Sequence, residues 1–314
     1  MIELSNVSKL FGQTRAVDDI CLTVQTGELC VLVGTSGCGK STTLRMINRL
    51  IAHSAGSIRI DGRDIEQIDP QQLRRGIGYA IQSTGLFPHW TVARNIAVVP
   101  RLLGWPVARI RQRVEELLQL LELAPAEFAG KYPHQLSGGQ AQRVGVARAL
   151  AGDPQILLMD EPFGALDPIT RESLQNELLR IQSQVRKTIV FVTHDMDEAL
   201  KLANRIVVMD KGRIVQQDSP QALLAKPANA FVENLLGGQE RGLKQAGLLR
   251  VAALMQALAT TAAPAAGPRV MATDNLRQAL SLMLWHRCSS LPVVDEQGLQ
   301  VGVLQLDALM SRPQ

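Results

Sequence analysis

One eight-residue run limits what this chain can fold into more than any other feature. It fits the pattern G-x-x-x-x-G-K-[ST] and consists of Gly34, Thr35, Ser36, Gly37, Cys38, Gly39, Lys40 and Ser41. The residues before it, 29–33, are apolar, as in a parallel strand that is buried on both faces, and residues 41–47 are expected to begin a helix. Because a strand, a glycine loop and a helix in this order bind nucleotide phosphates, the run predicts a nucleotide-binding α/β protein.

The residue types of this run, called the phosphate loop below, fit the chemistry of a bound ATP. The backbone N–H groups of residues 37–41 would surround the phosphates at a helix N-terminus, where the helix dipole favours anions. Lys40 would place its charge on the β- and γ-phosphate oxygens, and the Ser41 hydroxyl would bind Mg²⁺. Thr42, the next residue, completes this candidate nucleotide-binding set.

Two adjacent carboxylates follow a second apolar run, residues 156–159. Such a run predicts a buried strand that delivers Asp160 to the sheet edge where the phosphate loop lies. Asp160 is therefore a candidate Mg²⁺ residue, and Glu161 is free to polarise the attacking water as a general base. A pair of neighbouring acids is common on protein surfaces, but its place directly after this strand favours the catalytic interpretation.

A second glycine run narrows the superfamily. Residues 136–140, called the signature run below, read Leu-Ser-Gly-Gly-Gln, and Arg143 follows them. Together with the phosphate loop and the Asp160–Glu161 pair, this run resembles the ATP-hydrolysing subunit of an ABC transporter. The resemblance covers residues 2–236, and it implies ATP and Mg²⁺ as the bound groups.

The resemblance assigns roles to four further residues. His194, which follows the expected strand 188–192, matches a histidine that contacts the γ-phosphate and orders the attacking water. Gln82 matches the glutamine that joins the metal site to a helical subdomain, so it is both a metal and a nucleotide candidate. Phe11 matches an aromatic residue that stacks on adenine, and Asp167 matches the dimer-contacting turn called the D-loop.

The resemblance also implies a homodimer. In this family the signature run does not reach the phosphate loop of its own chain, and it caps the γ-phosphate bound to a second subunit. Two copies would therefore bury two shared ATP molecules between them. The residues expected to act in this way are Ser137, Gly138, Gly139 and Gln140.

The pattern along the chain predicts an α/β fold with several parts. We expect a P-loop ABC ATPase domain over residues 1–236, with a parallel sheet that includes strands 156–159, 188–192 and 205–209, an antiparallel β-subdomain, and a helical subdomain at about 87–152. Within the latter, residues 106–123 repeat apolar side chains at helical spacing. Residues 237–247 are expected to form a linker.

The last part, residues 248–311, resembles a single CBS domain of the α+β type. The order β-α-β-β-α is expected, with Asp274 capping a helix, strands at 291–294 and 299–304, and Asp307 capping a last helix. The apolar face of the first helix is expected to comprise Leu276, Leu280, Met283 and Leu284. Gln305 and Ala308 stand where a nucleotide-binding CBS domain usually has Thr or Ser and Asp, which argues against adenosine binding there.

Composition excludes some classes of function. The net charge is +4, but Lys and Arg are scattered without a dense basic run, so no nucleic-acid partner is expected. The four cysteines have no disulfide or metal-ligand spacing and are expected to be reduced thiols. No stretch of 18 apolar residues and no secretion signal is visible, so neither a membrane span nor secretion is expected. The resemblance to an ABC transporter ATPase implies a peripheral protein at the cytoplasmic face of the inner membrane.

The run 79–89 and the CBS-like part resemble the ATPases of importers for osmoprotectants such as glycine betaine or choline. This resemblance implies integral-membrane permease subunits and, indirectly, an extracytoplasmic solute-binding protein. The alternatives are an importer for another small solute such as an amino acid, a non-transport ABC ATPase, and a nucleotide sensor without enzymatic activity.

Overall fold

The computed structural model describes residues 1–81, 85–164, 166–262 and 267–310. The chain divides into two compact units, residues 1–220 and 221–314, and each is described by itself. This division falls earlier in the chain than the predicted boundary after residue 236. In the described part of the chain, no helix has both the length and the apolar character needed to cross a bilayer.

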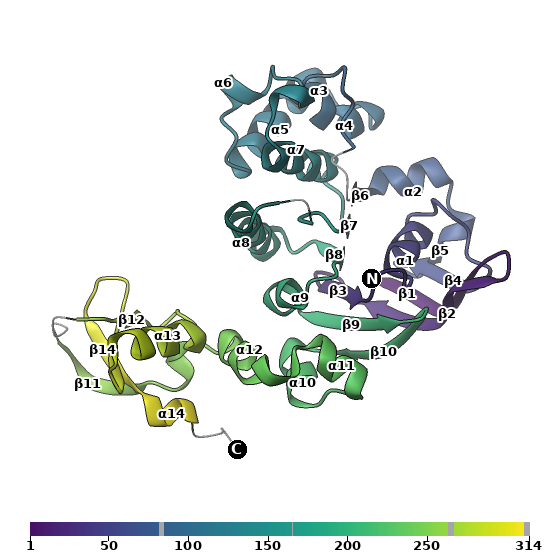
Figure 1. Ribbon diagram of the computed structural model, residues 1–314. Helices are drawn as coiled ribbons and strands as arrows, with labels where there is room; N and C mark the ends of the chain where they lie inside the picture. The colour runs from purple at the N-terminus through teal and green to yellow at the C-terminus, as the bar shows by residue number, and fades with distance from the viewer. Residues whose placement is uncertain (82–84, 165, 263–266, 311–314) are drawn as a thin grey trace. The chain divides into compact units, whose positions relative to one another are not determined.

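A six-stranded sheet forms the centre of the first unit (Figure 1), in the order β10-β9-β3-β8-β7-β6. All neighbouring strands are parallel except the antiparallel pair β9–β10. The central strands are buried along their whole length, which explains their continuous apolar runs. The strands are β3 (Leu29–Gly34), β6 (Ile77–Ala80), β7 (Ile156–Asp160), β8 (Thr188–Val192), β9 (Arg205–Asp210) and β10 (Arg213–Asp218). The predicted strands are therefore confirmed.

A second, antiparallel sheet has the order β2-β1-β4-β5. Its strands are β1 (Ile2–Phe11), β2 (Thr14–Val24), β4 (Ala55–Ile60) and β5 (Arg63–Asp64). Helix α1 (Lys40–Ile47) buries Leu44, Met46 and Ile47 in one apolar cluster with side chains of both sheets. The start of α1 is thereby fixed beside the carboxyl end of β3.

The helices α3 to α7 gather in one part of this unit (Figure 1). They are α3 (Val92–Ile96), α4 (Val98–Leu102), α5 (Val107–Leu120), α6 (Pro125–Phe128) and α7 (Gly138–Leu150), with a 3₁₀ turn at Pro133–Gln135. Helix α5 buries Ile110, Val114, Leu117 and Leu118, as its periodicity predicts. The remaining elements are α2 (Pro70–Gly76), α8 (Pro168–Val185), α9 (Met196–Leu202) and a 3₁₀ turn at Ile65–Gln67.

The second unit contains a four-stranded sheet with the order β11-β14-β13-β12. Its elements are α11 (Ala230–Leu235), α12 (Arg241–Leu248), β11 (Gln256–Ala262), β12 (Val270–Met271), α13 (Leu276–His286), β13 (Ser290–Val294), β14 (Gln300–Gln305) and α14 (Leu306–Met310), with 3₁₀ turns at Gly238–Glu240 and Val251–Ala253; α10 (Pro220–Ala225) begins at the division. The predicted order β-α-β-β-α is present as β12 to α14. Residues 237–247, expected to be a linker, include most of α12, and Ala246 packs against the apolar cluster of this unit.

Two details of α13 differ from the prediction. Asn275, not Asp274, caps this helix, because its side chain accepts from the N–H of Gln278 at 2.9 Å. The carboxylate of Asp274 instead accepts from the N–H of Met271 at 2.8 Å. Leu284 was expected on the apolar face, but it is 68% exposed, and the buried residues of the helix are Leu276, Ala279 and Met283.

Candidate functional site

Three glycines give the phosphate loop its shape. Gly34, Gly37 and Gly39 have φ values of 150°, 78° and 106°, which side chains disfavour. A Cβ on Gly34 would lie 2.1 Å from the carbonyl oxygen of Met209, and one on Gly39 would lie 2.6 Å from that of Ala16. The chain can therefore close around the loop only with glycine at these positions.

Lys40 lies inside this loop with 5% of its surface exposed. Its Nζ donates to the carbonyl oxygens of Gly34 at 2.8 Å and Thr35 at 2.9 Å. Its Nζ also lies 3.6 Å from the Cys38 Sγ, and among the described residues Lys40 forms no ion pair. A buried ammonium group held in this way, at the start of α1, fits the binding of an anion.

Ser41 and Asp160 meet beside the loop. The Ser41 Oγ donates to the Asp160 Oδ1 at 2.7 Å, although the two residues lie far apart in the sequence. Burial raises the pKa of Asp160 above its usual range, and the hydrogen bond from Ser41 opposes that shift. A hydroxyl and a carboxylate are hard oxygen ligands, so this pair fits Mg²⁺.

The described residues contain no cluster of three or more His, Cys, Asp or Glu side chains that could hold a metal by themselves. Mg²⁺ commonly binds through one or two carboxylates together with the substrate phosphates. A small donor set beside the phosphate loop is therefore compatible with Mg²⁺ that arrives with ATP.

Glu161 directly follows β7 and His194 lies just after β8, and their side chains face each other. Strands β7 and β8 are parallel with Asp160 opposite Val192, and the Glu161 N–H donates to the Val192 carbonyl at 3.0 Å. Glu161 has a φ of 45°, which turns the chain sharply after β7. Its Oε2 lies 3.2 Å from the His194 Nδ1. The structure thus brings together the general-base candidate and the histidine that the sequence predicted separately.

The signature run begins α7. The Ser137 Oγ accepts from the Gln140 N–H at 3.2 Å, and the Gln140 Oε1 accepts from the Ser137 N–H at 3.0 Å, a reciprocal capping box. A Cβ on Gly139 would lie 2.7 Å from the Thr170 Cγ2, so Gly139 packs against α8. Within the described part of the chain, no hydrogen bond joins the signature run to the phosphate loop. The structure leaves the two glycine runs as separate surfaces.

The remaining predicted residues are dispersed. Asp167 caps α8 by accepting from the Thr170 N–H at 3.0 Å, which lowers the pKa of Asp167. Phe11 is 51% exposed at the end of β1, with the Lys9 Nζ 4.9 Å from its ring centroid. Thr42 is half-buried on α1. Gln82 lies outside the described residues.

Sequence reasoning missed three polar residues that fix the chain segments around the helices α3 to α7. Arg148 Nη1 donates to the Gly85 carbonyl at 2.6 Å, and burial lowers the pKa of Arg148. The fully buried Asn95 accepts from the Phe87 N–H at 2.7 Å. Gln142 Nε2 donates to the carbonyl of Pro162, directly after Glu161. A polar residue among buried helical positions was the available signal, but its partner could not be known.

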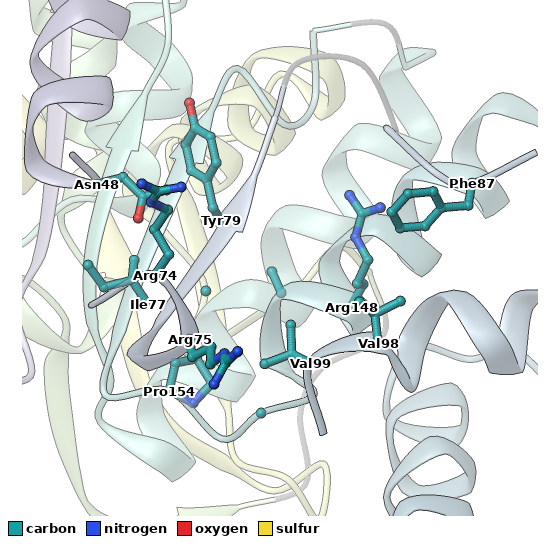
Figure 2. A pocket seen from close by; sticks show the side chains of 13 residues that line it. Asn48, Arg74, Arg75, Ile77, Tyr79, Phe87, Val98, Val99, Arg148 and Pro154 are labelled. Carbon is teal, nitrogen blue, oxygen red and sulfur yellow. The ribbon is translucent and has the colours of Figure 1, made fainter. Parts of the chain in front are cut away.

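A cavity of about 290 Å³ lies between α2 and β6 on one side and α4 and α7 on the other. Figure 2 shows Arg74 and Tyr79 on the sheet side, and Arg148 with Phe87 on the opposite side. Its described lining carries three arginines, Arg74, Arg75 and Arg148, and no carboxylate. The cavity therefore favours an acidic or amphipathic partner.

The chain was compared with known families and curated proteins. The ABC transporter family matches residues 17–164. The "Glycine betaine uptake system ATP-binding protein" of Escherichia coli (strain K12) is 53% identical over 310 residues, which cover 99% of each chain. The "Glycine betaine/carnitine/choline transport ATP-binding protein" of Bacillus subtilis (strain 168) is 49% identical over 310 residues, which cover 98% of this chain and 79% of that protein.

The chain is also similar to solved structures of ABC transporter components. A dimeric ATP-binding cassette in a post-hydrolysis state with ADP and Pi has a TM-score of 0.64 at 34% identity, over 70% of this chain and 99% of that chain. A component of an ABC transporter complex from Clostridium perfringens has a TM-score of 0.67 at 27% identity, over 77% of this chain and 97% of that chain.

Proposed function

The chain belongs to the ATP-binding proteins of ABC transporters, and on that premise we propose that it hydrolyses ATP to energise uptake of an osmoprotectant such as glycine betaine or choline. The observation that supports hydrolysis is the Glu161–His194 contact beside the Ser41–Asp160 pair, at the carboxyl ends of adjacent strands. The solute class rests on the printed names of relatives at 45–53% identity.

The binding half of the proposal uses the phosphate loop. The backbone N–H groups of residues 37–41 and the Lys40 ammonium hold the phosphates of ATP. Ser41 and Asp160, together with Gln82, would hold Mg²⁺, which would neutralise phosphate charge when bound. Phe11 stacks on adenine through its ring face.

The chemical half uses Glu161 and His194. The Glu161 carboxylate accepts a proton from the water that attacks the γ-phosphate. His194 donates to the γ-phosphate and holds the water in line, and its contact with Glu161 keeps the two groups at one place. This proposal explains why Glu161 follows Asp160 directly: the strand end fixes one carboxylate and the sharp turn presents the other.

We further propose that two copies form the working unit. Ser137, Gly138, Gly139 and Gln140 of one copy cap the ATP held by the phosphate loop of the other, and Asp167 lies at the contact. The supporting observations are the separation of the two glycine runs in the described chain and the dimeric state of a related cassette. Hydrolysis would then release the two copies from each other.

The other partners are an integral-membrane permease and, indirectly, an extracytoplasmic solute-binding protein, with no nucleic acid. The protein would act as a peripheral subunit at the cytoplasmic face of the inner membrane. The arginine-lined cavity of Figure 2 is the candidate surface for an acidic helix of the permease. Residues 248–311 form a single CBS-like domain in this proposal.

The direct test of ATP hydrolysis is Glu161→Gln. The amide keeps the shape of the side chain but cannot take the proton from water, so kcat should fall by about 10²–10⁴-fold while ATP still binds. Phosphate release and nucleotide binding measure the two effects. Glu172→Gln, an exposed carboxylate on α8, is the matched control and should keep wild-type turnover. A Glu161→Gln protein with near wild-type turnover would exclude Glu161 as the base.

The solute class has a separate test. The chain is reconstituted with its permease and binding protein in vesicles, and ATP-dependent uptake of labelled glycine betaine, choline and amino acids is compared. Uptake of an amino acid in place of the quaternary amines would contradict the osmoprotectant assignment without affecting the ATPase assignment.

A further inference from the structure

Arg171, in the first turn of α8, connects two catalytic segments. Its Nη2 donates to the carbonyl oxygen of Leu166 at 3.1 Å, in the turn that leads from Glu161 to Asp167. Its Nη1 lies 3.6 Å from the Asp195 Oδ2, and Asp195 is the residue directly after His194. One guanidinium therefore contacts the segment after the general base and the segment after the histidine.

Asp195 makes this link specific for His194. Its Oδ1 caps α9 by accepting from the N–H groups of Asp197 at 2.9 Å and Glu198 at 3.2 Å. Its own N–H donates to the Thr193 Oγ1 at 3.0 Å, on the other side of His194. A displacement of the Asp195 carboxylate would therefore move the backbone on both sides of His194.

A buried pair fixes the same two helices behind Arg171. The Gln175 Nε2 donates to the Glu198 Oε1 at 3.0 Å, and the two residues are 7% and 6% exposed. Gln175 lies one turn after Arg171 on α8, and Glu198 lies in the first turn of α9. The two helices are thereby held together by two neighbouring contacts on the same face, an ion pair and a buried hydrogen bond.

Thr170 and Leu166, which lie beside Arg171 and its carbonyl partner, also contact the signature run of the same chain. Gly139 leaves room for Thr170, the residue before Arg171, with only 2.7 Å between its hypothetical Cβ and the Thr170 Cγ2. Leu166, whose carbonyl Arg171 holds, is the next nearest side chain to that position. Contacts therefore run from Gly139 through the start of α8 and Arg171 to Asp195 and His194.

We propose that Arg171 is a positioning residue for hydrolysis: it holds the turn before Asp167 and the His194 segment in one geometry, so that docking of a second copy at that turn sets His194 against the γ-phosphate. This inference rests on the proposed function. Arg171 does not touch the reacting atoms, and its planar fork is what allows one side chain to bind a carbonyl and a carboxylate together.

The test compares Arg171→Met, Arg171→Lys and Asp195→Asn. Misplacing catalytic groups lowers turnover more than ground-state binding, so Arg171→Met should reduce kcat by about 10-fold and leave the KM for ATP within about twofold. Arg171→Lys keeps the charge but not the fork, and it should restore part of kcat. Asp195→Asn keeps the ability to cap α9 and should match Arg171→Met.

The double variant separates a link from two independent effects. If Arg171 acts through Asp195, the Arg171→Met/Asp195→Asn protein should lose no more than about 10-fold in kcat, whereas independent effects would multiply to about 100-fold. Arg180→Met is the control: it lies on the same helix and pairs with Glu177 at 2.7 Å, and its kcat should stay at the wild-type level.

Multiplying losses, or a kcat of Arg171→Met equal to that of Arg180→Met, would overturn the inference. If Arg171→Met does not fold, as thermal unfolding would reveal, Arg171→Lys paired with Asp195→Asn completes the same cycle. Failure of the proposed function is distinguishable, because wild-type protein would then show no hydrolysis that depends on Glu161.

Discussion

The phosphate loop and the signature run both place glycines at the start of a helix, but they differ in what surrounds them. The phosphate loop is enclosed by its own chain, and a Cβ at Gly39 would lie 2.6 Å from a backbone oxygen. The signature run is open: Ser137 and Gly138 are exposed, and a Cβ at Gly138 would have no atom within 4 Å. One glycine is required by the fold of this chain, whereas the other is not.

The two helix starts also use their polar groups differently. Helix α1 has no side-chain cap and has the buried Lys40 in its first turn, so its N–H groups stay available to an anion. Helix α7 has a complete capping box, in which Ser137 and Gln140 satisfy each other. The phosphate loop is enclosed by its own chain, whereas the space over Gly138 is open. This difference supports the proposal that the space belongs to the nucleotide of a second copy.

The largest expected effect comes from Gly39→Ala. The substituted residue would have to hold a φ of 106° against the Ala16 carbonyl, and strain plus overpacking should lower the free energy of unfolding by about 1–3 kcal/mol. The distorted loop should also lose ATP binding. Chemical denaturation measures the loss of stability, and nucleotide titration measures the loss of ATP binding. A variant with wild-type stability and binding would show that the fold does not require glycine at position 39.

Gly138→Ala tests whether the open space over the signature run is needed by a second copy and not by the fold of its own chain. Because the added methyl group meets nothing within one chain and Ala is the better helix former, the free energy of unfolding and ATP binding by single copies should not fall. Steady-state hydrolysis should fall, by about tenfold, if the space is filled by a partner's nucleotide. Unchanged hydrolysis, or a loss of stability like that expected for Gly39→Ala, would contradict this difference between the two glycines.

A smaller effect is expected at Glu198, a buried carboxylate behind the site that the proposed chemistry does not use. Burial raises the pKa of Glu198 above the usual range of a glutamate, so its contribution to stability is present below that range and is lost as pH rises through the raised pKa. Glu198→Gln should therefore raise the Tm by about 2 °C near pH 7.5, and the gain should shrink as pH falls toward 4.5. A gain that is constant with pH would show that charge burial is not the cause.

The smallest effect is expected from removing residues 238–314. All residues with a proposed role in ATP binding and hydrolysis lie between Phe11 and Asp195, and the first unit has its own apolar core. Basal ATPase activity of the shortened protein should stay within about twofold of the full chain. A loss comparable to that of Glu161→Gln would place part of the catalytic site in the second unit.

The sequence predicted those features that depend on local pattern. The strands β3, β7 and β8 were visible as apolar runs. Because parallel strands end at one edge of a sheet, the residues that follow them were expected to lie close together there. The cap of α13 was misplaced by one residue because Asp274 and Asn275 are both good caps, and only the contact with Met271 decides between them.

Long-range polar contacts could not be predicted. Arg148 with Gly85, Gln142 with Pro162, and Arg171 with Asp195 join segments whose distance in space is not encoded in periodicity. Leu284 fitted the apolar spacing of α13 and is nevertheless exposed, because the helix buries a narrower face than its sequence offers. The proposed sharing of the site is likewise a relation between two copies, which one sequence indicates only through resemblance.

In the proposed dimer, the phosphate loop of one copy and the signature run of the other form each working site. Purified mixed dimers that carry two lesions, Lys40→Ala and Ser137→Arg, test this arrangement most directly. With one lesion on each copy, both defects fall in the same site and the other site stays intact. With both lesions on one copy and a wild-type partner, each site has one defect.

If each site is shared between copies, the first mixed dimer should retain substantial ATP hydrolysis and the second almost none, measured as phosphate release per dimer. Equal activity of the two mixed dimers would contradict a site shared between copies.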